Sequence, residues 1–180
     1  MRLIVYFSLA FAFSELVLML VKRSKEIQVK TRNDKGSLIF LWLVITCGFF
    51  GGFILSKPMN QFWAGFGILF IIAGLIIRWV AILQLGNSFT VDVAVNNAAK
   101  LKTDGVYKRI RHPSYLGILL VVIGFSTIMS SFYSFLVLVV PEFLAIIYRI
   151  RVEEQLLKNE FGDSYSRYSR DTKKLIPGIY

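Results

Sequence analysis

Two polar segments of this sequence carry the residue types that can hold a small charged ligand. The first, LKTDGVYKRIRHPSYLG, runs from Leu101 to Gly117 and contains the only histidine of the chain, His112. The second, RIRVEEQLLKNEFGDSYSRY, runs from Arg149 to Tyr168. Their arginines, adjacent carboxylates and tyrosines offer donors, acceptors and aromatic faces, which suit a ligand that carries both positive and negative charge.

The spacing of these residues indicates where helices begin and continue. Pro113 fits the first turn of a helix, with His112 as its cap. If the second segment continues the apolar helix before it, Arg149 and Glu153 lie one turn apart on one face. An exposed pair in this order contributes at most ~0.2 to 0.5 kcal/mol, so helix stability is a poor reason for it. Together with Glu154 and the His112 cap, the pair predicts a small charged site.

A second interpretation of the same residues stays open. His112 and Pro113 are also ordinary punctuation at a helix start. Arg109 and Arg111 are also suited to anchoring a helix at lipid headgroups.

The apolar runs that must position these segments predict an all-α, polytopic integral membrane protein. Of 180 residues, 56% are apolar and 18% are charged, which is outside the balance of a soluble domain. We expect a single membrane domain over residues 1–180 with about five transmembrane helices, approximately at residues 3–21, 38–55, 62–83, 115–129 and 132–148. The polar segments 84–114 and 149–180 then form a cytoplasmic cofactor site.

The basic residues support this count because they gather on one side of five spans. Six lie between Lys22 and Lys35, five between Gln84 and Pro113, and seven from Arg149 onward. The positive-inside bias makes that side cytoplasmic and places the amino terminus outside, in the plasma membrane if the chain is microbial. The net charge of +10 then suits contact with anionic lipid headgroups, and no nucleic acid is expected as a partner.

Other reactive side chains are few. The lone Cys47 allows neither a disulfide framework nor a thiolate metal site, and no metal is expected. Glu15, Arg78 and Glu142 lie within apolar runs, where a charge is costly unless it is paired or hydrated. They indicate a polar substrate route, a buried ion pair or a side chain that snorkels to the membrane surface. Pro141 and Glu142 also suggest a loosened helix through which a lipid-attached substrate enters.

Taken together, the second half of the chain resembles the isoprenylcysteine carboxyl methyltransferase family in its short microbial form. The resemblance rests on the order and spacing of six motifs: LGNSFTVDV at Leu85, LKTDGVY at Leu101, RHPSYLG at Arg111, RVEEQLL at Arg151, FGDSYSRY at Phe161 and LIPGIY at Leu175. The first two spans add little to it. The resemblance implies an enzyme that binds S-adenosylmethionine without a Rossmann domain.

The resemblance also implies roles for individual residues. Arg149 matches the arginine expected to hold the substrate carboxylate. We expect the catalytic residues to be Arg149, Glu153 and Glu154. Many family members have a histidine where this chain has Ala99. The implied cofactor contacts are Lys100, Leu101, Lys102, Tyr107, His112, Pro113, Ser114, Tyr115 and Glu153.

The implied reaction is carboxyl O-methylation of an isoprenylcysteine-like carboxylate on a lipid-attached or membrane-embedded substrate. A carboxyl group of pKa ~4 is already ionised at neutral pH, so the reaction needs no general base. Three alternatives remain: a phospholipid amine N-methyltransferase, an NADPH-dependent sterol reductase-like protein, and a membrane adaptor without enzymatic activity. The acceptor and the oligomeric state are not indicated by the sequence.

Overall fold

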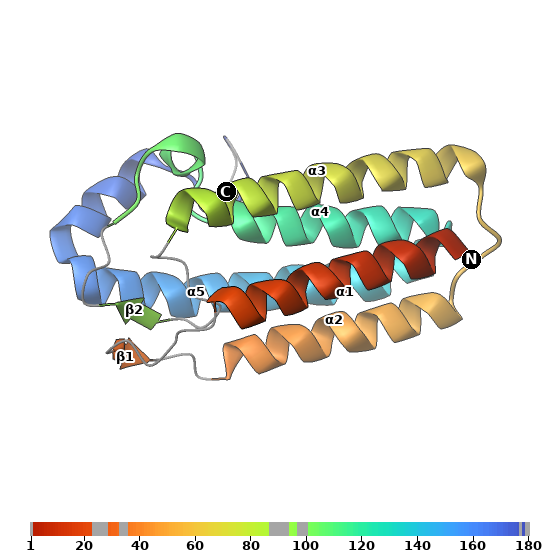
Figure 1. Cartoon of the computed structure of the whole chain (residues 1–180), viewed down its shortest axis with the longest axis horizontal. Helices are drawn as coiled ribbons and strands as arrows, with labels where there is room; N and C mark the ends of the chain where they lie inside the picture. Colours follow the sequence, from red (N-terminus) through yellow and green to blue (C-terminus); the bar gives the residue numbers. More distant parts are fainter. Residues whose placement is uncertain are drawn as a thin grey trace.

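The computed structural model describes residues 2–22, 29–32, 36–86, 94–96, 101–176 and 178. Five long helices lie along one another (Figure 1): α1 (Arg2–Lys22), α2 (Ser37–Ile54), α3 (Gln61–Leu85), α4 (Pro113–Ile128) and α5 (Phe132–Asp171). Three short elements lie beside them: β1 (Val29–Arg32), β2 (Ala94–Asn96) and the 3-10 helix η2 (Gly105–Lys108). The predicted all-α fold is confirmed, with an antiparallel pairing of β1 and β2 as an addition.

The helices fall close to the predicted spans. α1 to α4 begin and end within two residues of the expected positions, whereas α5 continues beyond residue 148 to Asp171. α2 and α3, with 18 and 25 residues, have the length and apolar composition needed to cross a membrane. Large apolar side chains such as Phe50, Leu69 and Leu144 are exposed along the bundle, as expected of an integral membrane protein. That α1, α4 and α5 also cross the bilayer stays a prediction.

Glycines bring α3 and α4 into very close contact. A Cβ atom on Gly74 would lie 2.6 Å from the carbonyl oxygen of Gly117, and one on Gly67 would lie 2.6 Å from that of Gly124. Side chains at these four positions would force the helices apart, whereas glycine lets their backbones touch. The close approach holds α3 against α4 from Gly117 to Gly124.

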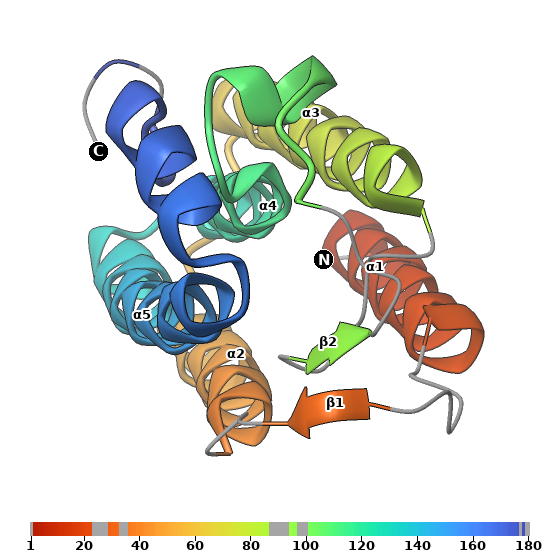
Figure 2. The ribbon, with the colours of Figure 1, turned by 90° about the vertical axis from the view of Figure 1, so that its left-hand side faces the viewer.

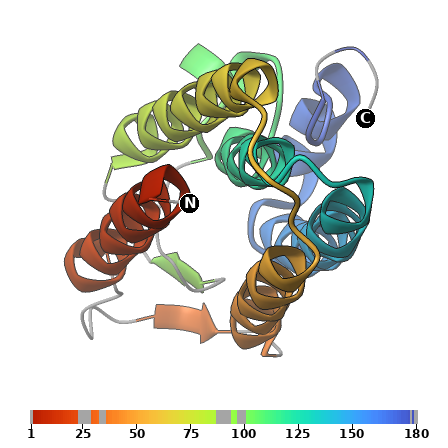
Figure 3. The same cartoon turned by 90° about the vertical axis from the view of Figure 1, so that its right-hand side faces the viewer.

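Around the bundle, the helices follow the order α1, α3, α4, α5 and α2 (Figure 3). α2 meets α5 through Gly52, whose carbonyl oxygen accepts a 2.8 Å hydrogen bond from Ser134 Oγ. The core between the helices is apolar and includes Ile71, Val121, Phe125 and Ile146, none of them more than 1% exposed.

Glu142 also lies in this interior, and it is 1% exposed. Neither of its carboxyl oxygens has a hydrogen-bond partner among the described residues. The hypothesis that Pro141 and Glu142 form a substrate entry stays a prediction.

The polar segments meet at one end of the bundle (Figures 1 and 2), where α2 and α4 begin and α3 ends. α5 passes this end and breaks at Gly162, which has a φ of 52° and a ψ of −121°. The segment after α5 then returns alongside the start of α4, where the amide of His112 donates to the Lys174 carbonyl at 2.9 Å. Leu175 is fully buried in the core. This return places the end of the chain against the predicted site.

Candidate active site

Arg149 lies at the centre of the polar end, in the part of α5 just beyond the predicted span. It is 3% exposed. Its Nε donates to the hydroxyl of Tyr115 at 2.9 Å, and its Nη1 donates to Ser37 Oγ at 2.9 Å. Hydroxyl groups from α4 and α2 therefore orient a guanidinium that α5 supplies.

Glu153 and His112 meet one helical turn beyond Arg149. The Oε2 atom of Glu153 lies 3.7 Å from His112 Nδ1. The other ring nitrogen, Nε2, lies 3.5 Å from Glu154 Oε1 without the alignment of a hydrogen bond. His112 is 4% exposed, and Pro113 occupies the first turn of α4. The predicted helix start and the predicted meeting of His112 with the α5 carboxylates agree with this geometry.

Glu154 is held by two cations in addition to the imidazole. Its Oε1 accepts from Arg111 Nε at 2.9 Å, and its Oε2 lies 3.2 Å from Lys174 Nζ. Burial alone would raise the pKa of the Glu154 carboxyl, but His112 and Arg111 together lower this pKa to about 2. Glu154 is thus ionised at neutral pH.

Arg111, for which headgroup anchoring was the open alternative, is buried and bound within the protein. It is 9% exposed. Besides Glu154, it donates from Nη1 to the carbonyl oxygens of Ser169, at 2.9 Å, and Thr172. Arg111 therefore joins the start of α4 to the end of α5. Arg109, in contrast, is exposed.

Two tyrosines close the polar cluster from the side of η2 and the end of α5. Tyr107 is buried and donates its hydroxyl to the Ala81 carbonyl at 3.2 Å. Tyr168 donates its hydroxyl to the Tyr107 carbonyl at 2.7 Å. Burial raises the pKa of Tyr107, with Glu153 adding to the effect, and burial raises the pKa of Tyr168 to about 12 although Arg111 opposes it. Both hydroxyls stay protonated at neutral pH.

Most of the predicted site residues come together here: Tyr107, His112, Pro113, Ser114, Tyr115, Arg149, Glu153 and Glu154. Leu101 and Lys102 lie in the loop before η2, where Lys102 pairs with Asp104 at 3.0 Å. Lys100 and Ala99 lie outside the described residues.

Some residues of the cluster were not predicted from the sequence. Ser37, which orients Arg149, is the first residue of α2 and resembles any serine at a helix start. Lys174 reaches Glu154 from the returning end of the chain. No local sequence signal identifies either contact, because both depend on which segments the fold brings together.

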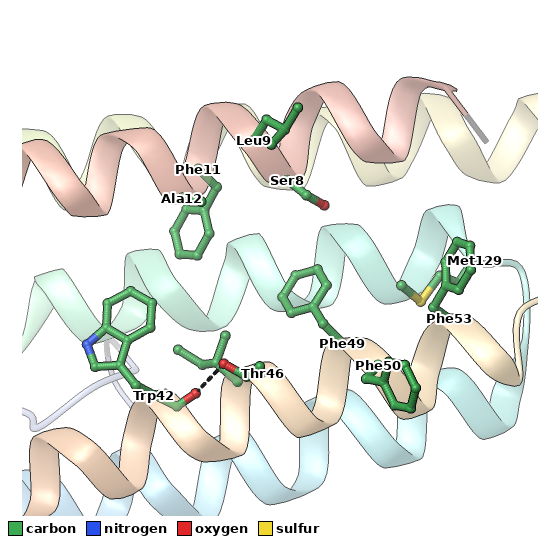
Figure 4. A pocket seen from close by; sticks show the side chains of 11 residues that line it. Ser8, Leu9, Phe11, Ala12, Trp42, Thr46, Phe49, Phe50, Phe53 and Met129 are labelled. Atoms are coloured by element: carbon green, nitrogen blue, oxygen red, sulfur yellow. Dashed lines mark hydrogen bonds between the residues drawn. The ribbon is translucent and has the colours of Figure 1, made fainter.

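An apolar cavity of about 520 Å³ lies between α1 and α2 (Figure 4). Aromatic side chains from α2 line most of its length, with Trp42 at one end and Phe53 at the other (Figure 4). Met129 at the end of α4 also lines it. Such a cavity accommodates an apolar chain better than a polar group.

A known protein family matches the part of the chain that carries most of this site. The sequence model of the isoprenylcysteine carboxyl methyltransferase family matches residues 67–159, which is about half of the chain and contains Arg78, His112, Arg149 and Glu153. The chain belongs to this family. The predicted resemblance is therefore confirmed.

Individual relatives agree with the family assignment. The chain is 34% identical over 130 residues to protein-S-isoprenylcysteine O-methyltransferase A of Arabidopsis thaliana, a match that covers 70% of this chain and 66% of the relative. It is 34% identical over 140 residues to protein-S-isoprenylcysteine O-methyltransferase of Schizosaccharomyces pombe, covering 76% of this chain and 58% of the relative. The chain thus spans less than two thirds of the length of each of these two relatives.

A solved structure shows the same fold. It is that of a eukaryotic intramembrane Ras methyltransferase, an isoprenylcysteine carboxyl methyltransferase, with a TM-score of 0.64 and 23% sequence identity. The match covers 96% of this chain and 64% of the other. The likeness includes α1 and α2, which precede the region matched by the family model.

Proposed function

We propose that this chain is an S-adenosylmethionine-dependent methyltransferase that esterifies the carboxylate of an isoprenylcysteine-like, lipid-attached acceptor. The proposal rests on membership of the family, on relatives named for isoprenylcysteine O-methylation, and on the polar cluster at one end of an apolar bundle. We place this end on the cytoplasmic side, because most Lys and Arg residues gather there.

The orientation of Arg149 is the observation that carries the proposal. Guanidinium presents donors in a fixed plane that matches a carboxylate. Tyr115 and Ser37 take hydrogen bonds from two of its nitrogens, so its plane is set before the acceptor arrives. An acceptor carboxylate held on one oxygen by Arg149 keeps its other oxygen available for attack, and most of the rate gain comes from this orientation.

The residues around Arg149 suit the cofactor. Glu153 Oε2 and His112 Nε2 are buried and lack a hydrogen-bond partner among the described residues, so they suit the ammonium and hydroxyl groups of S-adenosylmethionine. When bound, this cofactor supplies a methyl group on a sulfonium: an O–C bond forms as the C–S bond breaks, giving a neutral ester and a thioether. Because opposite charges disappear in that step, the buried setting of Arg149 and His112 favours it.

The lowered pKa of Glu154 disfavours this residue as the base that an amine acceptor would need. A phospholipid ammonium, of pKa near 10, must lose its proton before it accepts a methyl group. Glu154 is a weak base for that purpose, because its pKa is lowered to about 2 by His112 and Arg111 against the effect of burial. A carboxylate acceptor needs no such proton transfer.

The cavity between α1 and α2 supports a lipid-attached acceptor. It is lined mainly by apolar side chains, most of them on α2 (Figure 4), and Ser37 at the start of α2 accepts a hydrogen bond from Arg149. Burial of a chain there would contribute roughly 0.8 kcal/mol per methylene group.

Transfer of a labelled methyl group to defined acceptors tests the proposal. The full chain, purified in detergent with methyl-labelled S-adenosylmethionine, is given N-acetyl-S-farnesylcysteine, its carboxamide analogue or phosphatidylethanolamine. We expect label only in the first acceptor, released by alkali as the methyl ester hydrolyses. Equal labelling of the carboxamide, or label in alkali-stable phospholipid, would contradict carboxyl methylation.

A further inference from the structure

A buried ion pair joins α1 to α3 near the polar end of the bundle. Arg78 Nε lies 2.5 Å from Glu15 Oε1, and Arg78 Nη2 lies 2.6 Å from Glu15 Oε2. Glu15 is 4% exposed and Arg78 is 7% exposed. The two parallel hydrogen bonds fix the plane of the guanidinium as well as its position.

The third nitrogen of Arg78 reaches the start of α4. Its Nη1 donates to Ser114 Oγ at 2.8 Å and lies 3.5 Å from the Ser114 carbonyl oxygen. All three guanidinium nitrogens are thus engaged. The close contact of α3 with Gly117, where a Cβ would lie 2.7 Å from the Cβ of Arg78, makes this short reach possible.

Ser114 connects the ion pair to the site. It follows His112 and Pro113, and it precedes Tyr115, whose hydroxyl accepts from Arg149. A chain of contacts therefore runs from the buried pair of Glu15 and Arg78 through the first turn of α4 to the guanidinium proposed to hold the acceptor. We propose that Glu15 is a positioning residue for methyl transfer, acting through Arg78 on this turn of α4.

Stability alone explains the pair poorly. Removing two charges from water costs several kcal/mol, and well-packed apolar residues often replace a buried ion pair without loss of stability. What the pair provides is a defined geometry. Glu15 also lies outside the matched family region, residues 67–159, so α1 contributes to the site from the part of the chain that the family model does not describe.

The same two helices offer a matched control. Trp79 Nε1 donates to Ser14 Oγ at 3.0 Å, one residue away on each helix from the ion pair. Ser14→Ala removes this contact between α1 and α3 and leaves Glu15 and Arg78 in place. Glu15→Gln keeps the shape of the side chain but removes its charge and one of its two acceptor oxygens.

The inference rests on the proposed function, so the kinetic test compares these variants with the unaltered protein. We expect Glu15→Gln to lower kcat/KM for the farnesylated acceptor by tenfold or more at saturating S-adenosylmethionine, a condition chosen because the same turn of α4 carries implied cofactor contacts. Glu15→Asp should recover part of the rate because it restores the charge. Ser14→Ala should keep kcat/KM within twofold. Equal losses in Glu15→Gln and Ser14→Ala would mean that α1 is merely tethered and would overturn the inference.

A second readout does not depend on activity. Hydrogen–deuterium exchange of the backbone amides of residues 114–117 should become faster in Glu15→Gln and stay unchanged in Ser14→Ala. If the unaltered protein methylates no acceptor, the proposed function fails, and exchange alone then decides the positioning of α4. Unchanged exchange in Glu15→Gln would overturn the positioning role whatever the activity.

Discussion

The close contact between α3 and α4 predicts that replacing Gly117 by alanine destabilises the protein. A Cβ placed on Gly117 would lie 2.6 Å from the Gly74 carbonyl oxygen, 2.7 Å from Arg78 Cβ and 2.9 Å from the Arg78 amide nitrogen. Ordinary contacts begin at 3.4 Å, so the helices must separate by roughly 0.8 Å in Gly117→Ala, the difference between 3.4 and 2.6 Å. Backbone atoms form two of these contacts, so rotation of a side chain cannot relieve the clash.

The expected cost follows from this overpacking. Inserting a methyl group into a closely packed interior costs about 1 to 3 kcal/mol, and 1 kcal/mol shifts the Tm of a chain of this size by about 2 to 4 °C. We therefore expect Gly117→Ala to melt about 2 to 12 °C below the unaltered protein in detergent. It should also lose methyl transfer, because Arg78 is moved away from Ser114.

Gly65 supplies the control for this experiment. It lies on α3, is exposed, and has nothing within 4 Å of an added Cβ. Gly65→Ala should leave the Tm unchanged or raise it slightly, because alanine is the better helix former by about 1 kcal/mol. A Gly117→Ala protein that melts at or above the temperature of Gly65→Ala would refute the close contact of α3 and α4.

Three further outcomes follow from the site. Ser37→Ala removes a hydrogen-bond partner of Arg149. Because one hydrogen bond contributes about 0.5 to 1.5 kcal/mol, this variant should lower kcat/KM for the farnesylated acceptor about 2- to 12-fold, with an unchanged Kd for S-adenosylhomocysteine by calorimetry. An unchanged kcat/KM would contradict the role of Ser37. The pKa of Glu154 is lowered from 4.5 to about 2, so its contribution to stability is present above pH 4.5 and is lost as the pH falls towards 2. The melting temperature of Glu154→Gln should therefore depend less on pH in that window, and a pH profile parallel to that of the unaltered protein would exclude this linkage. Gly162→Ala places a side chain at a φ of 52° and a ψ of −121°, a sparsely populated conformation that costs about 1 to 3 kcal/mol, and it should lower the Tm. A Tm equal to that of the unaltered protein would argue against the break in α5.

The helix positions could be predicted from the sequence because long apolar runs set them locally. α1 to α4 lie within two residues of the expected spans. The Arg149–Glu153 spacing likewise depends only on the period of one helix. Both features need no knowledge of which helices are neighbours.

The remaining contacts depend on long-range packing. The sequence identifies Glu15 and Arg78 as costly charges and leaves a buried ion pair as one of three interpretations, but their contact requires α1 to lie beside α3. The return of Lys174 to Glu154 depends on the break at Gly162. The sequence around each residue contains no signal for its partner.

Arg149 is proposed to hold the acceptor, whereas Glu153 is proposed to contribute to cofactor binding. The most direct measurement compares Arg149→Ala and Glu153→Ala by calorimetry with S-adenosylhomocysteine and by methyl transfer to the farnesylated acceptor. We expect Arg149→Ala to abolish transfer with a nearly unchanged Kd, and Glu153→Ala to weaken binding itself. Equal losses of binding in the two variants, or full transfer by Arg149→Ala, would contradict the account.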